Sequence, residues 1–170
     1  MKNLDLKVKN KLFDLLARNI SLESFEQWLY TDIDVLNKVD SDDFVFELIN
    51  RDFKDKHILQ DLEKLGFTKY NKEEYLVYAV ESVCKRILEN RTCDNMVETA
   101  LFLDKYYNWN DDYQIIYAFY GIACNFDLVE IGYYSRGQIM AELKVLSIEI
   151  LDKFSDASLN KRIDILKTGL

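Results

Sequence analysis

The stretch SLESFEQWLYTDIDVLNKVDSDDFVFELINRDF, residues 21–53, carries two strong helix-start signals. Ser21 precedes a run of apolar residues at helical spacing and is a favourable N-cap, because its side chain can accept a hydrogen bond from a free backbone N–H. Asp32 is expected to cap a short turn, and Ser41 to cap a further helix that ends near Phe53. This stretch therefore predicts short helices joined by polar turns.

The composition of the whole chain predicts the same fold class. The 170 residues include five glycines and no proline, whereas sheets and extended connections usually need more of both at their turns. Apolar residues make up 49% of the chain, which is typical of a folded globular protein. We predict an all-α fold of about eight helices in antiparallel hairpins, as a compact bundle or a short solenoid-like stack. No low-complexity linker divides the chain, so residues 1–170 are expected to form a single helical domain.

Apolar periodicity and N-cap signals place the other helices. We expect them at residues 4–18, 55–65, 72–90, 94–107, 113–125, 138–154 and 158–167. Gly66 is expected to end the second of these helices, with residues 67–70 as an extended connector. Residues 127–137 fit either a loop or a short helix.

The charge of the chain narrows the classes of partner. The formal net charge is −8 at pH 7, whereas binders of nucleic acids or anionic membranes usually present basic surfaces. A basic protein partner suits this chain better than either. The alternative is that net negative charge only keeps the protein soluble.

Neither a membrane span nor a secretory signal is expected from the sequence. The longest apolar runs are too short to cross a bilayer, and charged residues interrupt the N-terminal segment. Cys84, Cys93 and Cys124 are odd in number and lack a CxxC spacing, which favours reduced thiols in a cytoplasmic protein.

No motif for catalysis or metal binding is recognisable. His57 is the one histidine, so a histidine-rich zinc site cannot form and the same residue would have to serve any catalytic triad. The glycine-rich phosphate-binding motifs and the G-x-S-x-G elbow are absent. Capping explains the acidic pairs at 42–43 and 111–112. We expect no enzymatic activity, no cofactor and no metal; a hydrolase that uses carboxylates alone is the alternative left open.

Acidic residues are concentrated in the opening stretch. Residues 21–43 hold seven acids and one base, Lys38, for a net charge of −6, which leaves −2 for the rest of the chain. A local charge of this kind can raise the rate of association with a basic partner by about 10- to 1,000-fold. Capping and binding are compatible, since a first-turn Asp stays exposed. The predicted partner-binding residues are Glu23, Glu26, Asp32, Asp34, Asp40, Asp42, Asp43, Trp109, Asp111 and Asp112.

Aromatic residues suggest a second kind of surface. The chain has 11 Tyr, 10 Phe and 2 Trp, most of which are expected in the core, while exposed Tyr and Trp often anchor interfaces. The alternative function, a helical-repeat adaptor for protein partners, predicts an exposed concave face formed by Tyr106, Trp109, Tyr113 and Tyr117.

Part of the chain resembles a group of small bacterial immunity proteins, which neutralise polymorphic toxins delivered between competing cells, as in contact-dependent growth inhibition. The resemblance lies in a Phe-Glu-x-Trp-aliphatic-Tyr cluster, an acidic step, and a helix that ends in Glu-Leu-Ile before an aromatic-Lys pair. The matching residues here are Phe25, Glu26, Trp28, Leu29, Tyr30, Glu47, Leu48, Ile49, Phe53 and Lys54. About a quarter of the chain is covered, and most of the pattern consists of packing residues.

The resemblance implies a cytoplasmic inhibitor whose partner is the C-terminal domain of a cognate toxin. Toxins of this kind are often basic nucleases, and an acidic surface can occupy a groove lined by Lys and Arg in place of phosphates. The resemblance does not identify the toxin.

Overall fold

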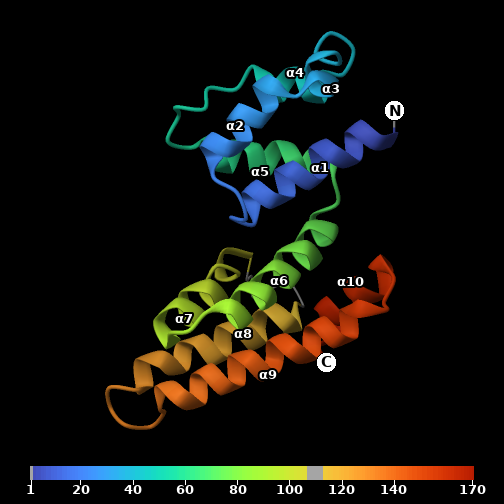
Figure 1. The fold of residues 1–170 in the computed structure, drawn as a ribbon. Coiled ribbons are helices and arrows are strands. Elements are labelled where there is room, and N and C mark those ends of the chain that lie inside the picture. Colours follow the sequence, from blue (N-terminus) through green and yellow to red (C-terminus); the bar gives the residue numbers. More distant parts are fainter. Residues whose placement is uncertain (1, 107–112) are drawn as a thin grey trace. The chain divides into compact units, whose positions relative to one another are not determined.

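The structure, a computed structural model, describes residues 2–106 and 113–170. All regular secondary structure in these residues is helical, with ten α-helices and two short 3₁₀-helices (Figure 1). The all-α prediction is confirmed, and the helix count differs slightly from the eight expected. By its internal contacts the chain divides into two compact units, Met1–Tyr75 and Leu76–Leu170. The single domain stays a prediction.

The first unit is built around its N-terminal helix. Its helices are α1 (Lys2–Leu16), α2 (Leu22–Thr31), α3 (Ile33–Leu36), α4 (Asp43–Ile49), α5 (Ile58–Lys69) and the first residues of α6 (Lys72–Glu89). Helix α1 contacts α2, α3 and α5, and its Leu12 and Phe13 are almost fully buried. Phe13 makes edge-to-face contacts with Tyr70 and Tyr75, so aromatic packing holds the start of α6 in this unit.

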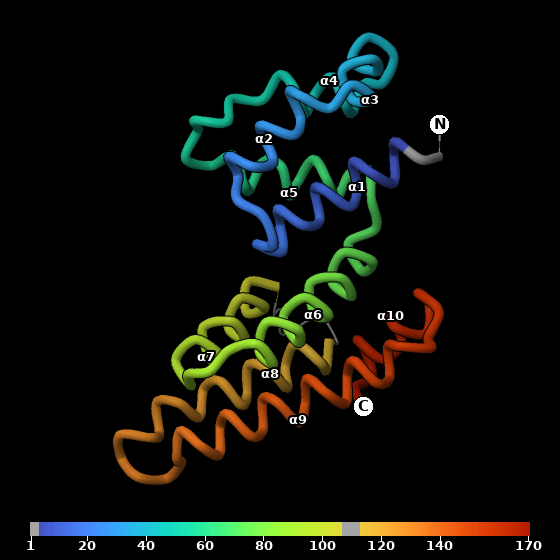
Figure 2. Tube along the Cα trace, viewed as in Figure 1, coloured from blue at the N-terminus to red at the C-terminus, as the bar shows by residue number. Residues whose placement is uncertain are grey.

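Side-chain caps fix the short helices of the opening stretch. The Ser21 and Asp32 caps are present: Ser21 Oγ accepts from the backbone N–H of Ser24, and Asp32 Oδ1 accepts from those of Asp34 and Val35. The Ser41 cap was predicted one residue too early, because Asp42 accepts from the first free N–H groups of α4. Figure 2 shows the turn between α3 and α4 and the irregular path from α4 to α5.

The prediction that Gly66 ends a helix is wrong. Helix α5 continues through Gly66 to Lys69, and Gly66 is buried. A Cβ atom at this position would lie 2.8 Å from Leu12 Cδ2. The glycine therefore serves close packing between α5 and α1. Of the connector expected at 67–70, the first three residues are helical, and Tyr70, the C-cap of α5, is extended.

The second unit has its own core. It contains the rest of α6, with α7 (Cys93–Leu101), η1 (Asp104–Tyr106), α8 (Gln114–Cys124), η2 (Asn125–Leu128), α9 (Arg136–Ser155) and α10 (Leu159–Thr168). Helix α8 contacts α7, α9 and α10 and forms a hairpin with α9 (Figure 1). Phe119, Leu143 and Phe154 are almost completely buried.

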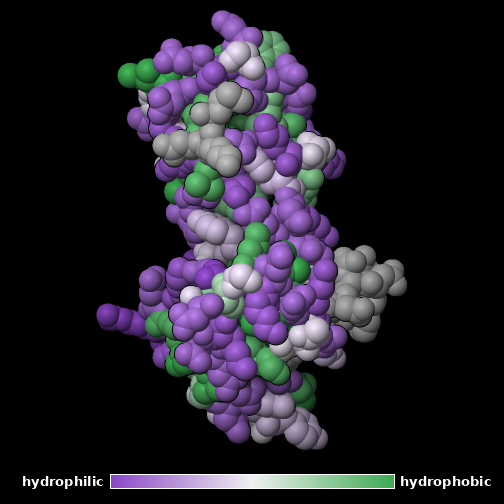
Figure 3. Space-filling view, turned by 90° about the vertical axis from the view of Figure 1, so that its right-hand side faces the viewer, coloured by the Kyte–Doolittle hydropathy of each residue, from purple (hydrophilic) through white to green (hydrophobic). Residues whose placement is uncertain are grey.

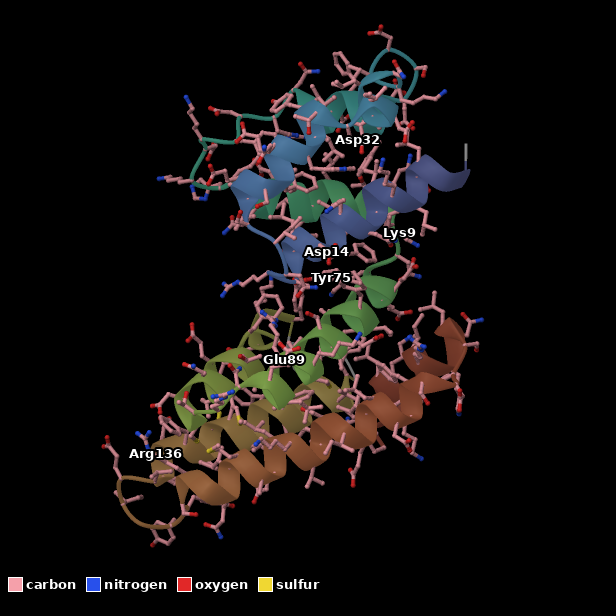
Figure 4. All side chains as sticks on the ribbon, viewed as in Figure 1. Lys9, Asp14, Asp32, Tyr75, Glu89 and Arg136 are labelled. Carbon is pink, nitrogen blue, oxygen red and sulfur yellow. The ribbon has the colours of Figure 1, made fainter. Side chains whose placement is uncertain are left out.

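The sequence fits either a loop or a short helix at residues 127–137. This segment contains the end of η2, a turn and the N-cap of α9. Ser135 and Gln138 form a capping box, so α9 begins at Arg136, two residues before the expected start. The Arg136 guanidinium pairs with Asp94 on α7 at 2.6 Å and lies over the Phe126 ring (Figure 4).

Candidate functional site: the acidic segment of the first unit

The aromatic residues of the resemblance form one packed cluster. Phe25 is fully buried and contacts Trp28 and Phe53, and Tyr30 contacts Phe53 edge to face. The Tyr30 hydroxyl donates to the carbonyl of Ile49 at 2.9 Å. These residues therefore join the C-terminal ends of α2 and α4.

Asp32 connects three elements through one carboxylate (Figure 4). Besides capping α3, it accepts from Trp28 Nε1 at 3.1 Å and pairs with Lys7 of α1 at 2.5 Å. The hydrogen bond from Lys7 lowers the pKa of Asp32, and the same bond raises the pKa of Lys7. Asp32 thus holds the four-residue helix α3, which is too short to be stable alone, against α1 and α2.

Asp42 has a similar structural role at the start of α4. It caps that helix, and Lys69 Nζ lies 4.0 Å from its Oδ1 and 3.5 Å from Oδ1 of Asp5. The ammonium also lies over the Phe44 ring. The Tyr70 hydroxyl lies nearby and donates to the Asp5 carboxylate. Burial and this carboxylate raise the pKa of Tyr70.

The other predicted acids lie at the surface. Asp34 is exposed and shares Lys7 with Asp32 at 3.2 Å. Glu23, Asp40 and Asp43 are exposed and Glu26 is half-buried, and these four side chains have no ion pair or hydrogen bond within residues 2–106 and 113–170. The structure therefore separates the acids into two caps held by lysines and a set that remains available to a partner.

Three of the predicted partner-binding residues belong to a second stretch, residues 109–112. Trp109, Asp111 and Asp112 lie outside the described residues. Of the tyrosines expected on the adaptor face, Tyr106 is buried, Tyr113 is half-buried and Tyr117 is exposed. Tyr106 therefore does not contribute to the exposed face that the adaptor alternative predicts.

Two groups of residues were missed by the sequence reasoning. Lys7 and Lys69 lie 25 or more residues from the acids they pair with, so no local spacing reveals these pairs. The second group is three exposed apolar side chains, Ile33, Leu36 and Phe46. One signal was present, because Phe46 lies off the apolar stripe that Phe44, Val45 and Leu48 form on α4.

Within residues 2–106 and 113–170, no three His, Cys, Asp or Glu side chains are grouped so as to hold a metal ion. His57 is exposed just before α5, and its side chain makes no capping hydrogen bond. Cys84 and Cys93 are buried and Cys124 is exposed. Among the described helices, none has the length and apolar character needed to span a bilayer. On the face shown in Figure 3, hydrophilic side chains predominate and the apolar ones form separate patches.

No family model matches the chain, and no significant match was found among curated proteins or solved structures.

Proposed function

We propose that this chain is an immunity protein that binds the C-terminal domain of a cognate toxin, of the basic, nuclease type, and neutralises it through the acidic surface of the first unit. The observation that carries the proposal is the set of exposed carboxylates at Asp34, Asp40 and Asp43. They lie on the same stretch that resembles the immunity proteins. Because Asp40 and Asp43 form no ion pair within the described residues, their charge is available to a partner.

The physical basis of this proposal is the negative charge of residues 32–43 and the fixed geometry of that segment. Residues 32–43 contain five Asp and one Lys, and Lys38 is half-buried. Caps at Asp32 and Asp42 hold the helices on either side of this turn. A pre-ordered acidic surface loses little conformational entropy on binding and can attract a groove lined by Lys and Arg.

The test is a binding and protection experiment. The purified chain is titrated with the C-terminal domain encoded by the gene immediately upstream, and the two are co-expressed in a sensitive host. We expect a one-to-one complex with nanomolar or tighter affinity, and growth in the presence of the toxin domain. Absence of both binding and protection rejects the proposed function.

A further inference from the structure

We infer that the toxin-facing surface is anchored by Ile33, Leu36 and Phe46, so that the partner is a basic protein surface with an apolar pocket. The inference rests on the proposed function and names the contacts that hold the complex together. These side chains are 72%, 44% and 52% exposed. Their apolar area therefore contributes little to the stability of this chain alone.

The local architecture orients these residues toward solvent. Val35, between Ile33 and Leu36, is fully buried, and the Asp32 cap fixes the start of the helix. On α4, Phe44, Val45 and Leu48 face the core, which places Phe46 on the opposite side of that helix. In both short helices a buried side and a capped start hold the exposed apolar side chains in place.

The two helices are close enough for one partner to contact both. Ile33 lies three residues after Tyr30 and Phe46 three residues before Ile49, and the Tyr30 hydroxyl bonds to the Ile49 carbonyl at 2.9 Å. Asp32, between Tyr30 and Ile33, is extended, so these two residues are separated by at most about 10 Å. Phe46 lies within α4, nearly one turn, about 5 Å, before Ile49, and a standard interface covers about 800 Å² on each partner. Such an interface can include Ile33 and Phe46 together.

Charge complementarity selects the kind of partner. Asp34, Asp43 and Glu47 are exposed on the same two helices. Asp34 pairs with Lys7 and Glu47 with Arg51 at the surface, whereas Asp43 forms no ion pair within the described residues. Carboxylates around an apolar anchor repel nucleic acids and anionic lipid and favour Lys and Arg around an apolar pocket. In such an interface the apolar anchors set mainly the dissociation rate, whereas the outer charges set mainly the association rate.

The test is surface kinetics with the same upstream-encoded toxin domain and the double variant I33S/F46S. The matched control is V145S/I148S, which replaces two α9 residues of similar exposure, 54% and 55%. We expect the dissociation rate of I33S/F46S to rise about 30-fold or more, with its association rate almost unchanged. The control is expected to match the wild-type chain.

Circular dichroism and thermal unfolding of both variants establish that they fold, as expected for exposed positions. If the wild-type chain binds and I33S/F46S dissociates at the wild-type rate, this inference is wrong while the proposed function stands. If the wild-type chain neither binds the toxin domain nor protects against it, both are rejected. Loss of binding in both double variants overturns the assignment to α3 and α4.

Discussion

Asp32 is the residue on which the acidic segment depends most, since it caps α3, accepts from Trp28 and pairs with Lys7. Asn is as good an N-cap as Asp, but the amide nitrogen that replaces Oδ2 can neither pair with Lys7 nor accept from Trp28. We expect D32A to lower the free energy of unfolding by about 1 to 2 kcal/mol and D32N by less than about 1 kcal/mol. Urea denaturation at pH 7 measures both. Equal losses in the two variants would show that the cap contributes nothing.

The ion pair also predicts a pH dependence. The pKa of Asp32 is lowered from 3.8, so its contribution is complete above that pH and is lost as the pH falls through the lower folded-state value. The pKa of Lys7 is raised from 10.5, so its contribution is present below that pH and is lost above it. The difference in the free energy of unfolding between the wild-type chain and D32N should therefore be constant from about pH 5 to about pH 9. It should shrink below about pH 3.8. A difference that is still unchanged at about pH 2.5 contradicts the ion pair between Asp32 and Lys7.

The cysteines differ in reactivity for a physical reason. Burial raises the pKa of the Cys84 thiol to about 12, and burial also raises the pKa of Cys93, whereas Cys124 is exposed. The thiolate is the reactive form of cysteine. Ellman's reagent at about pH 8 should therefore label Cys124 quickly in the native protein, and Cys84 and Cys93 only on unfolding. The C124S variant, which should lose the fast phase, is the control. Fast labelling of a second thiol contradicts the buried placement.

At the scale of helices, the packing of α5 on α1 depends on Gly66. An added Cβ meets the buried Leu12 side chain at 2.8 Å, and overpacking of this kind costs about 1 to 3 kcal/mol against a helix-propensity gain of about 1 kcal/mol from Ala. We expect G66A to be destabilising by about 1 kcal/mol.

The cause is tested by a double-mutant cycle. L12A alone should cost about 2 to 5 kcal/mol, and because it also removes the clash, L12A/G66A should be more stable than the sum of the single changes by about 1 kcal/mol. Denaturant titration of the four proteins gives the coupling. Additive losses would show that Gly66 is not required for the close approach of these helices.

Gly66 also shows which features of the fold cannot be predicted from the sequence alone. The existence of the helices and the caps at Ser21 and Asp32 followed from local signals. A glycine three residues from a helix end reads as a stop signal, and only the packing partner, 54 residues earlier in the chain, shows otherwise. Likewise Ser41 and Asp42 are both good caps, so the sequence could not decide between them.

The candidate site could be predicted only in part for the same reason. The acids were evident from composition, but their division into structural caps and exposed carboxylates depends on Lys7 and Lys69, which come from distant segments. The exposure of Ile33 depends on Val35 taking the buried side of α3. The lysine pairs and the exposure of Ile33 depend on tertiary packing, which no local sequence pattern reveals.

At the scale of the whole molecule, we assign partner binding to the first unit and none to the acids of α9. Charge reversal at Asp32 or Asp42 is unsuitable as a test because it would disrupt caps. Asp34, Asp40 and Asp43 are exposed, and none of them is the N-cap of α3 or α4. The matched control is E142Q/E149Q/D152N, which neutralises three exposed acids of α9.

The most direct measurement is therefore the association rate of the upstream-encoded toxin domain with the wild-type chain, with D34N/D40N/D43N and with the α9 control, at low and at physiological salt. We predict that D34N/D40N/D43N associates about tenfold or more slowly at low salt and depends less on salt, since steering charge is lost. The α9 control should keep the wild-type rate. Equal association rates for both triple variants would contradict the claim that the acidic surface of the first unit guides the partner.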